Sequence, residues 1–174
     1  MTKQKILEDF KYMSEFLNEL EWNAEVVGED TEYPTMVASL ELDEDCEETV
    51  VCNYLILPEE DAEYSKLLQL YCRLPLELET IPDAELIVLA NQLNALTTLG
   101  HFMYIPATGE NSHEIALRYV WAMTEDELPD EGVLGETLLI MMHYCQIMEG
   151  ILIRRLDGTS MEQLLDEVKE SCQR

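Results

Sequence analysis

Basic residues are scarce in this chain of 174 residues, which has 10 lysines and arginines against 37 aspartates and glutamates. The formal charge is −27, and the imbalance is greatest from Tyr12 to Ser65, where 17 acidic residues occur without a lysine or arginine. Proteins bind nucleic acids mainly through cations that neutralise phosphates, and anionic lipid surfaces attract the same cations. The composition therefore argues against binding to nucleic acid and against a role at a membrane surface.

Sequence signals for export, membrane insertion and zinc or redox chemistry are also missing. The N-terminal stretch MTKQKILEDF has no apolar signal core, and the run from Leu138 to Met142 is too short to span a bilayer. None of the five cysteines belongs to a C-x-x-C pair, which leaves buried, reduced thiols as the simplest interpretation. We therefore expect a cytoplasmic protein.

Signatures of catalysis and of cofactor binding are missing as well. The chain has only seven glycines and contains no G-x-S-x-G motif, phosphate-binding loop or dinucleotide fingerprint. Its three histidines, His101, His113 and His143, lack a partner His or Cys at metal-ligand spacing. We expect no catalytic residue, no cofactor and no metal site, and we interpret His143 as a structural or interface residue and His113 as part of a turn.

Hydrophobic periodicity predicts an N-terminal helix that is followed by several strands. Apolar residues recur every three or four positions in the first twenty residues, which is typical of a helix with one buried face. Alternating or β-branched patterns then predict strands over 22–30, 33–42, 49–57 and 65–76.

The second half of the chain is predicted to form a helix, a hairpin and two more helices. Pro82 suits the first position of the middle helix and Gly100 suits its end. On that helix, Asn91 and Asn94 are candidates for binding, but such residues more often face solvent or form hydrogen bonds to a neighbouring loop. The hairpin joins HFMYIP to EIALRYVWAM, whose alternation predicts one core face and one partly exposed face.

A long apolar helix from about Val133 to Leu156 and a short final helix complete the pattern. Either Thr159 with Glu162 or Ser160 with Gln163 can form the capping box of the final helix. The expected fold class is therefore α+β, with an antiparallel sheet of five to six strands flanked by an N-terminal helix, a middle helix and a long C-terminal helix plus a short final helix.

The long helix is expected to be buried on most sides, because its polar residues follow one narrow line. That line consists of Glu136, His143, Gln146, Gly150 and Arg154. Its apolar surface has three possible uses. It can fill the core, it can meet its own copy in a two-fold interface, or it can form a client groove in which Met141, Met142 and Met148 adapt to varied side chains.

One acidic stretch, ELDEDCEE from Glu41 to Glu48, is the candidate partner-binding site. Its six carboxylates lie between two predicted strands, which predicts a hydrated hairpin tip. It does not fit a calcium loop, because no glycine follows and the twelfth position is Tyr54 instead of a bidentate Glu. The candidate residues for attracting a basic partner are Glu41, Asp43, Glu44, Asp45, Glu47 and Glu48.

The run LLQLYCRLPLELETIPDAELIVLANQLNAL, followed by GHFMYI and EIALRYVW, resembles the YbjN-like proteins and the type III secretion chaperone-like fold. The resemblance covers most of the chain up to about Leu156. It implies a helix-sheet-helix domain that dimerises and acts by binding other proteins. On this basis we expect a single domain over residues 1–174, with a chaperone-like core at 1–156 and an extra C-terminal helix at 159–172.

The sequence thus favours a non-enzymatic protein-binding module, a chaperone-like or regulatory adaptor whose acidic face attracts a basic or partly unfolded protein. We expect a homodimer that binds neither nucleic acid nor membrane. One alternative is an inhibitor or immunity protein that neutralises a basic toxin or nuclease. Another is an enzyme that acts on a small molecule with a divalent metal ion held by scattered carboxylates. The acidic excess is also compatible with a role in solubility alone.

Overall fold

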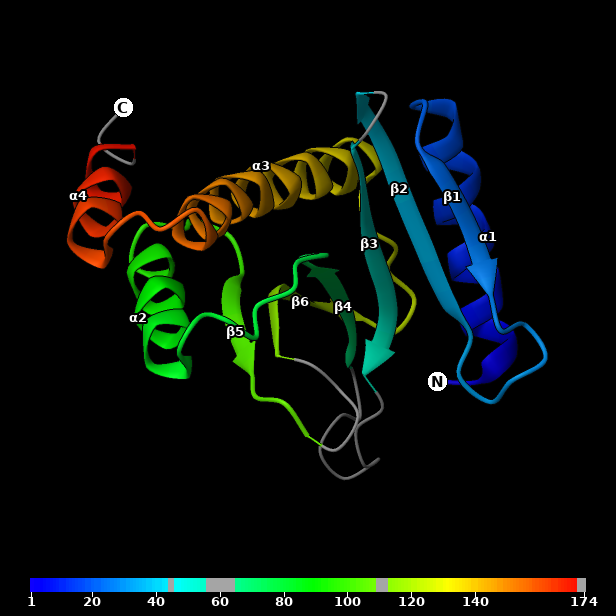
Figure 1. Cartoon of the computed structure of the whole chain (residues 1–174). Coiled ribbons are helices and arrows are strands. Elements are labelled where there is room, and N and C mark those ends of the chain that lie inside the picture. Colours follow the sequence, from blue (N-terminus) through cyan, green and yellow to red (C-terminus); the bar gives the residue numbers. More distant parts are fainter. Residues whose placement is uncertain (44–45, 56–64, 109–112, 172–174) are drawn as a thin grey trace. The chain divides into compact units, whose positions relative to one another are not determined.

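The computed structural model describes residues 1–43, 46–55, 65–108 and 113–171 (Figure 1). The expected α+β class is confirmed, since these residues form four helices and an antiparallel sheet of six strands. The elements in chain order are α1 (Lys3–Glu19), β1 (Asn23–Val27), β2 (Thr35–Asp43), β3 (Cys46–Leu55), β4 (Ser65–Arg73), α2 (Asp83–Asn94), β5 (His101–Ile105), β6 (Glu114–Thr124), α3 (Glu131–Leu156) and α4 (Met161–Ser171).

The strand order in the sheet is β1-β2-β3-β4-β6-β5, so β1 and β5 are its two edge strands among the described residues. The chain forms two compact units, each built from two separate stretches. Unit 1 comprises Met1–Cys72 and Tyr119–Leu139, and unit 2 comprises Arg73–Arg118 and Ile140–Arg174. Strand β6 and helix α3 each contribute one part to each unit.

Helix α1 covers β1 and β2 in unit 1 with the apolar stripe that the sequence predicts. Thr2 caps the helix by accepting the backbone N–H of Lys5 at 3.3 Å. Four stripe residues are buried, namely Ile6, Phe10, Met13 and Leu17. Leu20, which the pattern also placed in the stripe, is 48% exposed because the helix has already ended at Glu19.

The core face of the strands in unit 1 is built from alternate residues that stand in register. One cross-strand row consists of Ala24, Ala38, Val50 and Cys72, and the next contains Met36, Cys52 and Leu70. All seven side chains are buried. Because successive residues of a strand point to opposite faces, the period-2 pattern of the sequence is enough to predict which of them face the core.

Helix α2 of unit 2 begins one residue later and ends several residues earlier than the sequence predicts. Pro82 is the N-cap and Asp83 is the first helical residue, so Pro82 lies one position before its predicted place. The helix ends at Asn94, and Gly100 instead stands directly before β5 with φ of 73°. A Cβ at Gly100 would lie 2.8 Å from the carbonyl oxygen of Arg118, which explains why glycine is needed there.

Strand β6 is covered on both faces where it belongs to unit 2. Ile115, Ala116 and Leu117 are each fully buried, so the predicted partly exposed face is wrong for this part of the strand. Its partner β5 pairs with it in antiparallel register, with Phe102 opposite Leu117. The sequence of an interior strand that is covered on both faces is a continuous apolar run. The three residues Ile115, Ala116 and Leu117 form such a run.

Helix α3 buries one stripe and exposes a mixed face, so the expectation of burial on most sides is wrong. Its buried residues follow spacings of four and three and are Leu134, Leu138, Met141, Met142, Cys145, Met148 and Leu152. The predicted polar line is exposed together with Leu139, Ile140 and Ile153, which are 42–50% exposed. The three methionines are at most 2% exposed and therefore fill the core instead of lining a client groove.

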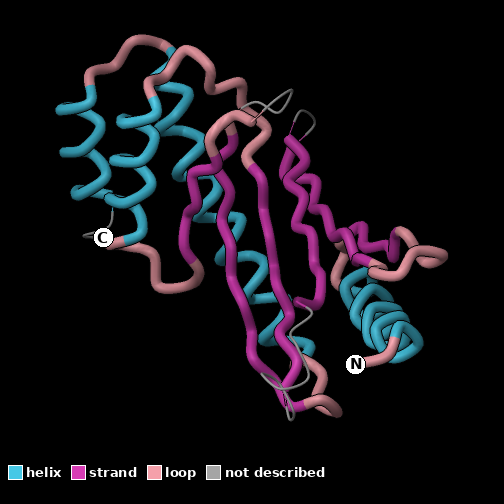
Figure 2. Tube along the Cα trace, turned by 90° about the horizontal axis from the view of Figure 1, so that it is seen from below, coloured by secondary structure: helices cyan, strands magenta, loops and turns pink. Residues whose placement is uncertain are grey.

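Helix α4 packs beside α2 in unit 2 (Figures 1 and 2). Gly158, with φ of 94°, separates it from α3. The capping box is formed by Ser160 and Gln163, because Ser160 Oγ donates to Gln163 Oε1 at 3.1 Å and accepts the backbone N–H of Gln163 at 3.4 Å. Leu164 and Val168 are buried.

Candidate functional site

The acidic stretch from Glu41 to Glu48 lies mostly in strands, because β2 continues to Asp43 and β3 begins at Cys46. The candidate residues Glu44 and Asp45 lie outside the described residues, and the side chains of Glu41, Asp43, Glu47 and Glu48 are not described either. The backbone register places Glu41 opposite Glu47, with a bulge between Glu41 and Asp43. Like charges at opposite cross-strand positions are unfavourable, so a cation brought to this hairpin would relieve repulsion.

A second group of acidic residues lies on α1, on β1 and in the connection between β1 and β2 of unit 1. The register pairs Asn23 of β1 with Ser39 of β2. Glu21 stands two residues before Asn23 and Glu41 stands two residues after Ser39, so both lie at the same end of this strand pair. We name this group the α1–β1 acidic surface. Its exposed members are Glu15, Glu19, Glu21, Glu25, Glu29, Asp30 and Glu32. In chain order its members run from the last turns of α1 through β1 to the connection between β1 and β2, elements that Figure 1 labels.

The few cations of unit 1 do little to neutralise these carboxylates. Unit 1 contains 25 acidic and four basic residues, a formal charge of −21, whereas unit 2 contains 12 acidic and six basic residues, a formal charge of −6. Lys5 and Lys66 both bind Asp9, and Lys11 lies 3.3 Å from Glu29. Lys3 is then the one lysine of unit 1 for which the described residues show no acidic partner.

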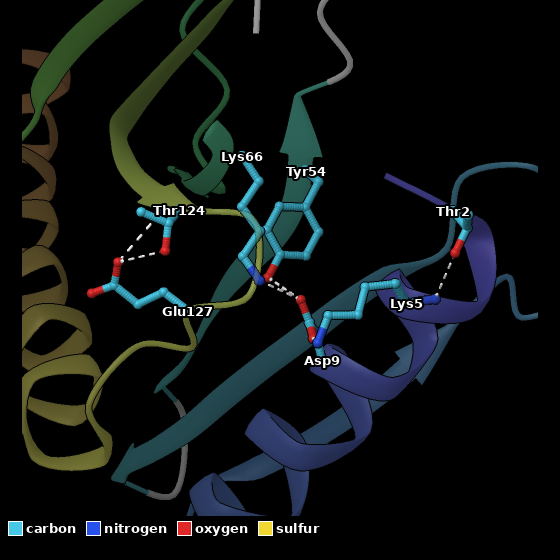
Figure 3. Close-up of polar contacts among 7 residues, drawn as sticks. All are labelled: Thr2, Lys5, Asp9, Tyr54, Lys66, Thr124 and Glu127. Carbon is cyan, nitrogen blue, oxygen red and sulfur yellow. Dashed lines mark hydrogen bonds and ion pairs between the residues drawn. The ribbon is translucent and has the colours of Figure 1, made fainter. Parts of the chain in front are cut away.

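The buried carboxylate of Asp9 is the centre of the polar cluster in Figure 3. Asp9 lies on α1 with 1% of its surface exposed and points toward β3 and β4. Its Oδ2 accepts from Lys66 Nζ at 2.6 Å and from Tyr54 Oη at 3.0 Å. Its Oδ1 lies 3.0 Å from Lys5 Nζ. Both oxygens of the carboxylate are therefore engaged by donors.

The cluster holds its charges in an apolar surrounding. Lys66 Nζ lies 5.3 Å from the centre of the Tyr54 ring, and Phe10 stacks on that ring with 5.2 Å between centroids. Burial, together with the negative charge of Asp9, raises the pKa of Tyr54 far above its ordinary value, so its hydroxyl remains a donor. The hydrogen bond to Asp9 raises the pKa of Lys5, which keeps this ammonium charged.

A pocket of about 380 Å³ adjoins this cluster on the side of Ile6 and Tyr54. Its walls come from α1, from the residues around Pro34 and from β3, and they are Ile6, Tyr33, Pro34, Thr35, Val51, Asn53, Tyr54 and Leu55. The lining carries no carboxylate, lysine or histidine. Its lining suits a small apolar group.

A smaller polar cluster in unit 2 joins the start of α2 to the β5–β6 hairpin. Tyr104 Oη and His113 Nδ1 lie 2.7 Å apart and share a hydrogen bond, and Asp83 Oδ1 lies 3.6 Å from the same nitrogen. Burial and the nearby Asp83 raise the pKa of Tyr104. His113 thus has partners on two elements, which goes beyond the turn position that the sequence predicts. His101 and His143 are exposed.

Within residues 1–43, 46–55, 65–108 and 113–171, no group of three or more His, Cys, Asp or Glu side chains is arranged to hold a metal ion. None of the described helices combines the length and apolarity needed to cross a bilayer. Cys52, Cys72 and Cys145 are buried, and burial raises the pKa of the Cys52 thiol to about 12. Such a thiol is a poor nucleophile.

Sequence reasoning missed the Asp9–Lys66 pair, although one signal was present. Lys66 lies on the same face of β4 as the buried Leu68 and Leu70. A lysine on a core face is almost always paired with an acidic residue. Asp9 lies beside Phe10 in the stripe of α1 and is the acidic counterpart.

Comparison of the chain with protein-family models, curated proteins and solved structures gives no match.

Proposed function

We propose that this protein is a cytoplasmic, non-enzymatic protein-binding module whose unit 1 attracts a basic partner. The observation that carries the proposal is the uneven charge, −21 on unit 1 against −6 on unit 2. Three of the four lysines of unit 1 are bound to Asp9 or Glu29, so the exposed α1–β1 acidic surface is left almost without compensation. The resemblance to chaperone-like proteins supports the same function.

Uncompensated surface charge acts on a partner before contact is made. A concentrated negative potential increases the rate at which a cationic protein collides in the correct orientation, and salt screens this effect within about 8 Å at physiological ionic strength. Binding through such a surface is therefore fast and sensitive to salt, with specificity added by closer contacts. The module makes and breaks no covalent bond in this proposal.

A pull-down from native lysate at about 50 and 500 mM salt, with partners identified by mass spectrometry, tests the proposal. We expect basic proteins that are retained at the lower salt and lost at the higher. A variant with four exposed carboxylates of unit 1 changed to amides should lose them, namely Glu15→Gln, Glu19→Gln, Glu21→Gln and Glu25→Gln.

A matched variant neutralises the same number of charges in unit 2 and serves as the control. It carries Glu77→Gln, Glu79→Gln, Asp157→Asn and Glu162→Gln, all of which are exposed positions. Retention of the same partners by this control, with loss in the unit 1 variant, supports the proposal. Equal loss in both variants, or partners that resist salt, contradicts it.

The β2–β3 hairpin favours a narrower version, an inhibitor or immunity protein that neutralises a basic toxin or nuclease. The backbone register places Glu41 opposite Glu47, and in this version the carboxylates of both strands imitate a phosphate track. Replacing Glu41, Asp43, Glu47 and Glu48 with amides should then slow association with the basic target. An unchanged association rate dismisses this version.

A homodimer is part of the proposal and is supported by exposed apolar residues on α3. Ile140 and Ile153, both in unit 2, are 42% and 44% exposed, and in the proposed dimer a second copy covers apolar surface of this kind. Sedimentation velocity should give twice the chain mass of 20.1 kDa. A single-chain mass at all concentrations contradicts the dimer.

A further inference from the structure

The side-chain amide of Asn94 forms two hydrogen bonds to one residue of an edge strand. Its Oδ1 accepts the backbone N–H of Phe102 at 2.5 Å, and its Nδ2 donates to the backbone carbonyl of Phe102 at 2.9 Å. Asn94 is the last residue of α2, and Phe102 is the second residue of β5. The sequence suggested hydrogen bonds from Asn94 to a neighbouring loop, and the structure shows that its partner lies in a strand.

Asn18 forms the same pair of bonds at the other edge strand. Its Oδ1 accepts the backbone N–H of Ala24 at 2.9 Å, and its Nδ2 donates to the carbonyl of Ala24 at 2.9 Å. Ala24 is the second residue of β1, as Phe102 is of β5. The two contacts lie in different units, since Asn18 and Ala24 belong to unit 1 and Asn94 and Phe102 to unit 2.

The local structures around the two asparagines match as well. Both asparagines occur in the sequence L-N-x-L, which is LNEL at 17–20 and LNAL at 93–96. In each, the first leucine is buried and its carbonyl accepts the backbone N–H of the second, at 3.0 Å for Leu17 and 2.8 Å for Leu93. A residue with positive φ follows before the strand, Glu21 in one case and Gly100 in the other.

A primary amide is suited to occupy the free side of a strand. It presents one acceptor and one donor side by side, as a backbone residue does in a closely spaced pair of an antiparallel ladder. Phe102 and Ala24 direct both polar groups to their asparagine, so at these residues the positions where another strand would bond are filled. An edge strand without such protection is a template for pairing with another molecule.

We propose that Asn18 and Asn94 are edge locks, which keep β1 and β5 from pairing with a strand of a second copy of this chain. Both locks lie on the two strands that end the sheet order, where such pairing would begin. Each lock is short and comes from the helix that precedes its strand, so it forms locally. The proposal is independent of the basic partner, because it concerns the sheet edges and not the acidic surface.

Asn94→Ala tests the lock on β5, with Asn91→Ala as the matched control. Asn91 lies on the same helix, is exposed, and its side chain has no hydrogen bond among the described contacts. Removing the amide frees the N–H and C=O of Phe102. We expect concentration-dependent association in sedimentation velocity beyond that of the wild type, and roughly tenfold faster hydrogen exchange at the Phe102 amide. The control should match the wild type.

A rescue variant distinguishes edge pairing from association through unfolding. Ile105 is the last residue of β5 and is 38% exposed, so a lysine there places a charge on the edge. Asn94→Ala combined with Ile105→Lys should return to the sedimentation behaviour of the wild type while the Phe102 amide still exchanges fast. Association that persists in the combined variant overturns the proposal, as does an Asn94→Ala chain that is less stable but associates no more than the wild type.

The lock on β1 is tested in the same way by Asn18→Ala, with Gln4→Ala as the control, because Gln4 is an exposed amide on α1 whose described side-chain bond goes to Glu8 of the same helix. We expect faster exchange at the Ala24 amide and added association, each absent from the control. If both Asn18→Ala and Asn94→Ala leave self-association at the wild-type level, the two amides only stabilise local structure, and the proposal fails.

Discussion

Asp9 and Lys66 form an ion pair inside unit 1, with 2.6 Å between Oδ2 and Nζ and with side chains that are 1% and 2% exposed. The pair joins α1 to β4, and Tyr54 of β3 completes it with a hydrogen bond. A buried charge is costly unless a partner of opposite charge and hydrogen bonds replace its water. Loss of Lys66 leaves Asp9 with Lys5 and Tyr54, whereas loss of Asp9 leaves the buried ammonium of Lys66 without a counter-ion among the described contacts.

Asp9→Asn should therefore lower the free energy of unfolding strongly. The amide keeps the shape of the side chain but leaves the ammonium of Lys66 buried without its counter-ion, which costs about 3–5 kcal/mol in comparable pairs. Urea unfolding followed by circular dichroism measures this loss. Adding Lys66→Met should recover at least half of it, since the uncompensated charge is then gone.

A surface ion pair provides the control for this experiment. Lys11 and Glu29 are 3.3 Å apart and both more than half exposed, so Lys11→Met should change the free energy of unfolding by less than about 1 kcal/mol. A similar small loss for Asp9→Asn would show that water reaches the Asp9 cluster, against the burial described above.

The buried thiol of Cys52 should make the fold sensitive to alkali. Its pKa is raised from 9.0 to about 12 by burial, so above pH 9 the unfolded chain ionises its thiol while the folded chain does not. The free energy of unfolding then falls as pH rises from about 9 to about 12, by on the order of 4 kcal/mol in total. The raised pKa of Tyr54 acts in the same direction.

Cys52→Val isolates this contribution, because it keeps an apolar side chain of similar volume and has no proton to lose. Urea unfolding at pH 8, 9.5 and 11 should show a smaller alkaline loss for the variant than for the wild type. Parallel curves for the two proteins would mean that Cys52 does not titrate differently in the folded and unfolded states.

Two glycines should respond in opposite directions to replacement by alanine. Gly100→Ala forces a side chain into a backbone with φ of 73° and within 2.8 Å of the Arg118 carbonyl oxygen, which should cost about 2 kcal/mol or more. Gly150→Ala lies within α3 with open space around it and should stabilise the fold by about 0.5–1 kcal/mol. Thermal unfolding of both variants measures the difference, and equal effects would contradict the described backbone at Gly100.

The last helix should depend on Ser160 and not on Thr159. Ser160 forms the capping box with Gln163, so Ser160→Ala should lower the free energy of unfolding by about 1 kcal/mol. Thr159→Ala removes the other possible cap of the sequence and should stay within about 0.5 kcal/mol of the wild type. The reverse order of the two losses would assign the cap to Thr159. Chemical denaturation of the paired variants decides between them.

Features set by neighbouring residues were predictable from the sequence, and those set by distant residues were not. The stripe of α1 and the alternation of β4 follow from local periodicity, and both appear in the structure. Gly100 follows the apolar stripe predicted for the middle helix, which suggested a helix end. Its actual role depends on the Arg118 carbonyl, 18 residues later, and that contact exists only once β5 and β6 are paired.

The candidate site shows the same division. The concentration of carboxylates between Tyr12 and Ser65 is visible in the sequence, but composition alone does not show that Lys5 and Lys66 are bound to Asp9. Lys66 is 57 residues from Asp9, and the pairing follows from the packing of α1 on the sheet. Similarly, the two L-N-x-L sequences have no evident meaning until β1 and β5 are known to end the strand order.

The division of unit 1 into Met1–Cys72 and Tyr119–Leu139 affects how the protein is made on the ribosome. After Cys72 is synthesised, the 67 residues from Arg73 to Leu139 must follow before unit 1 is complete, which takes about 3–13 s at typical translation rates. During that time the nascent N-terminal part waits unfinished beside other nascent chains of the same polysome. The 17 carboxylates from Tyr12 to Ser65 then repel the same segment of neighbouring nascent chains, before any folded surface exists.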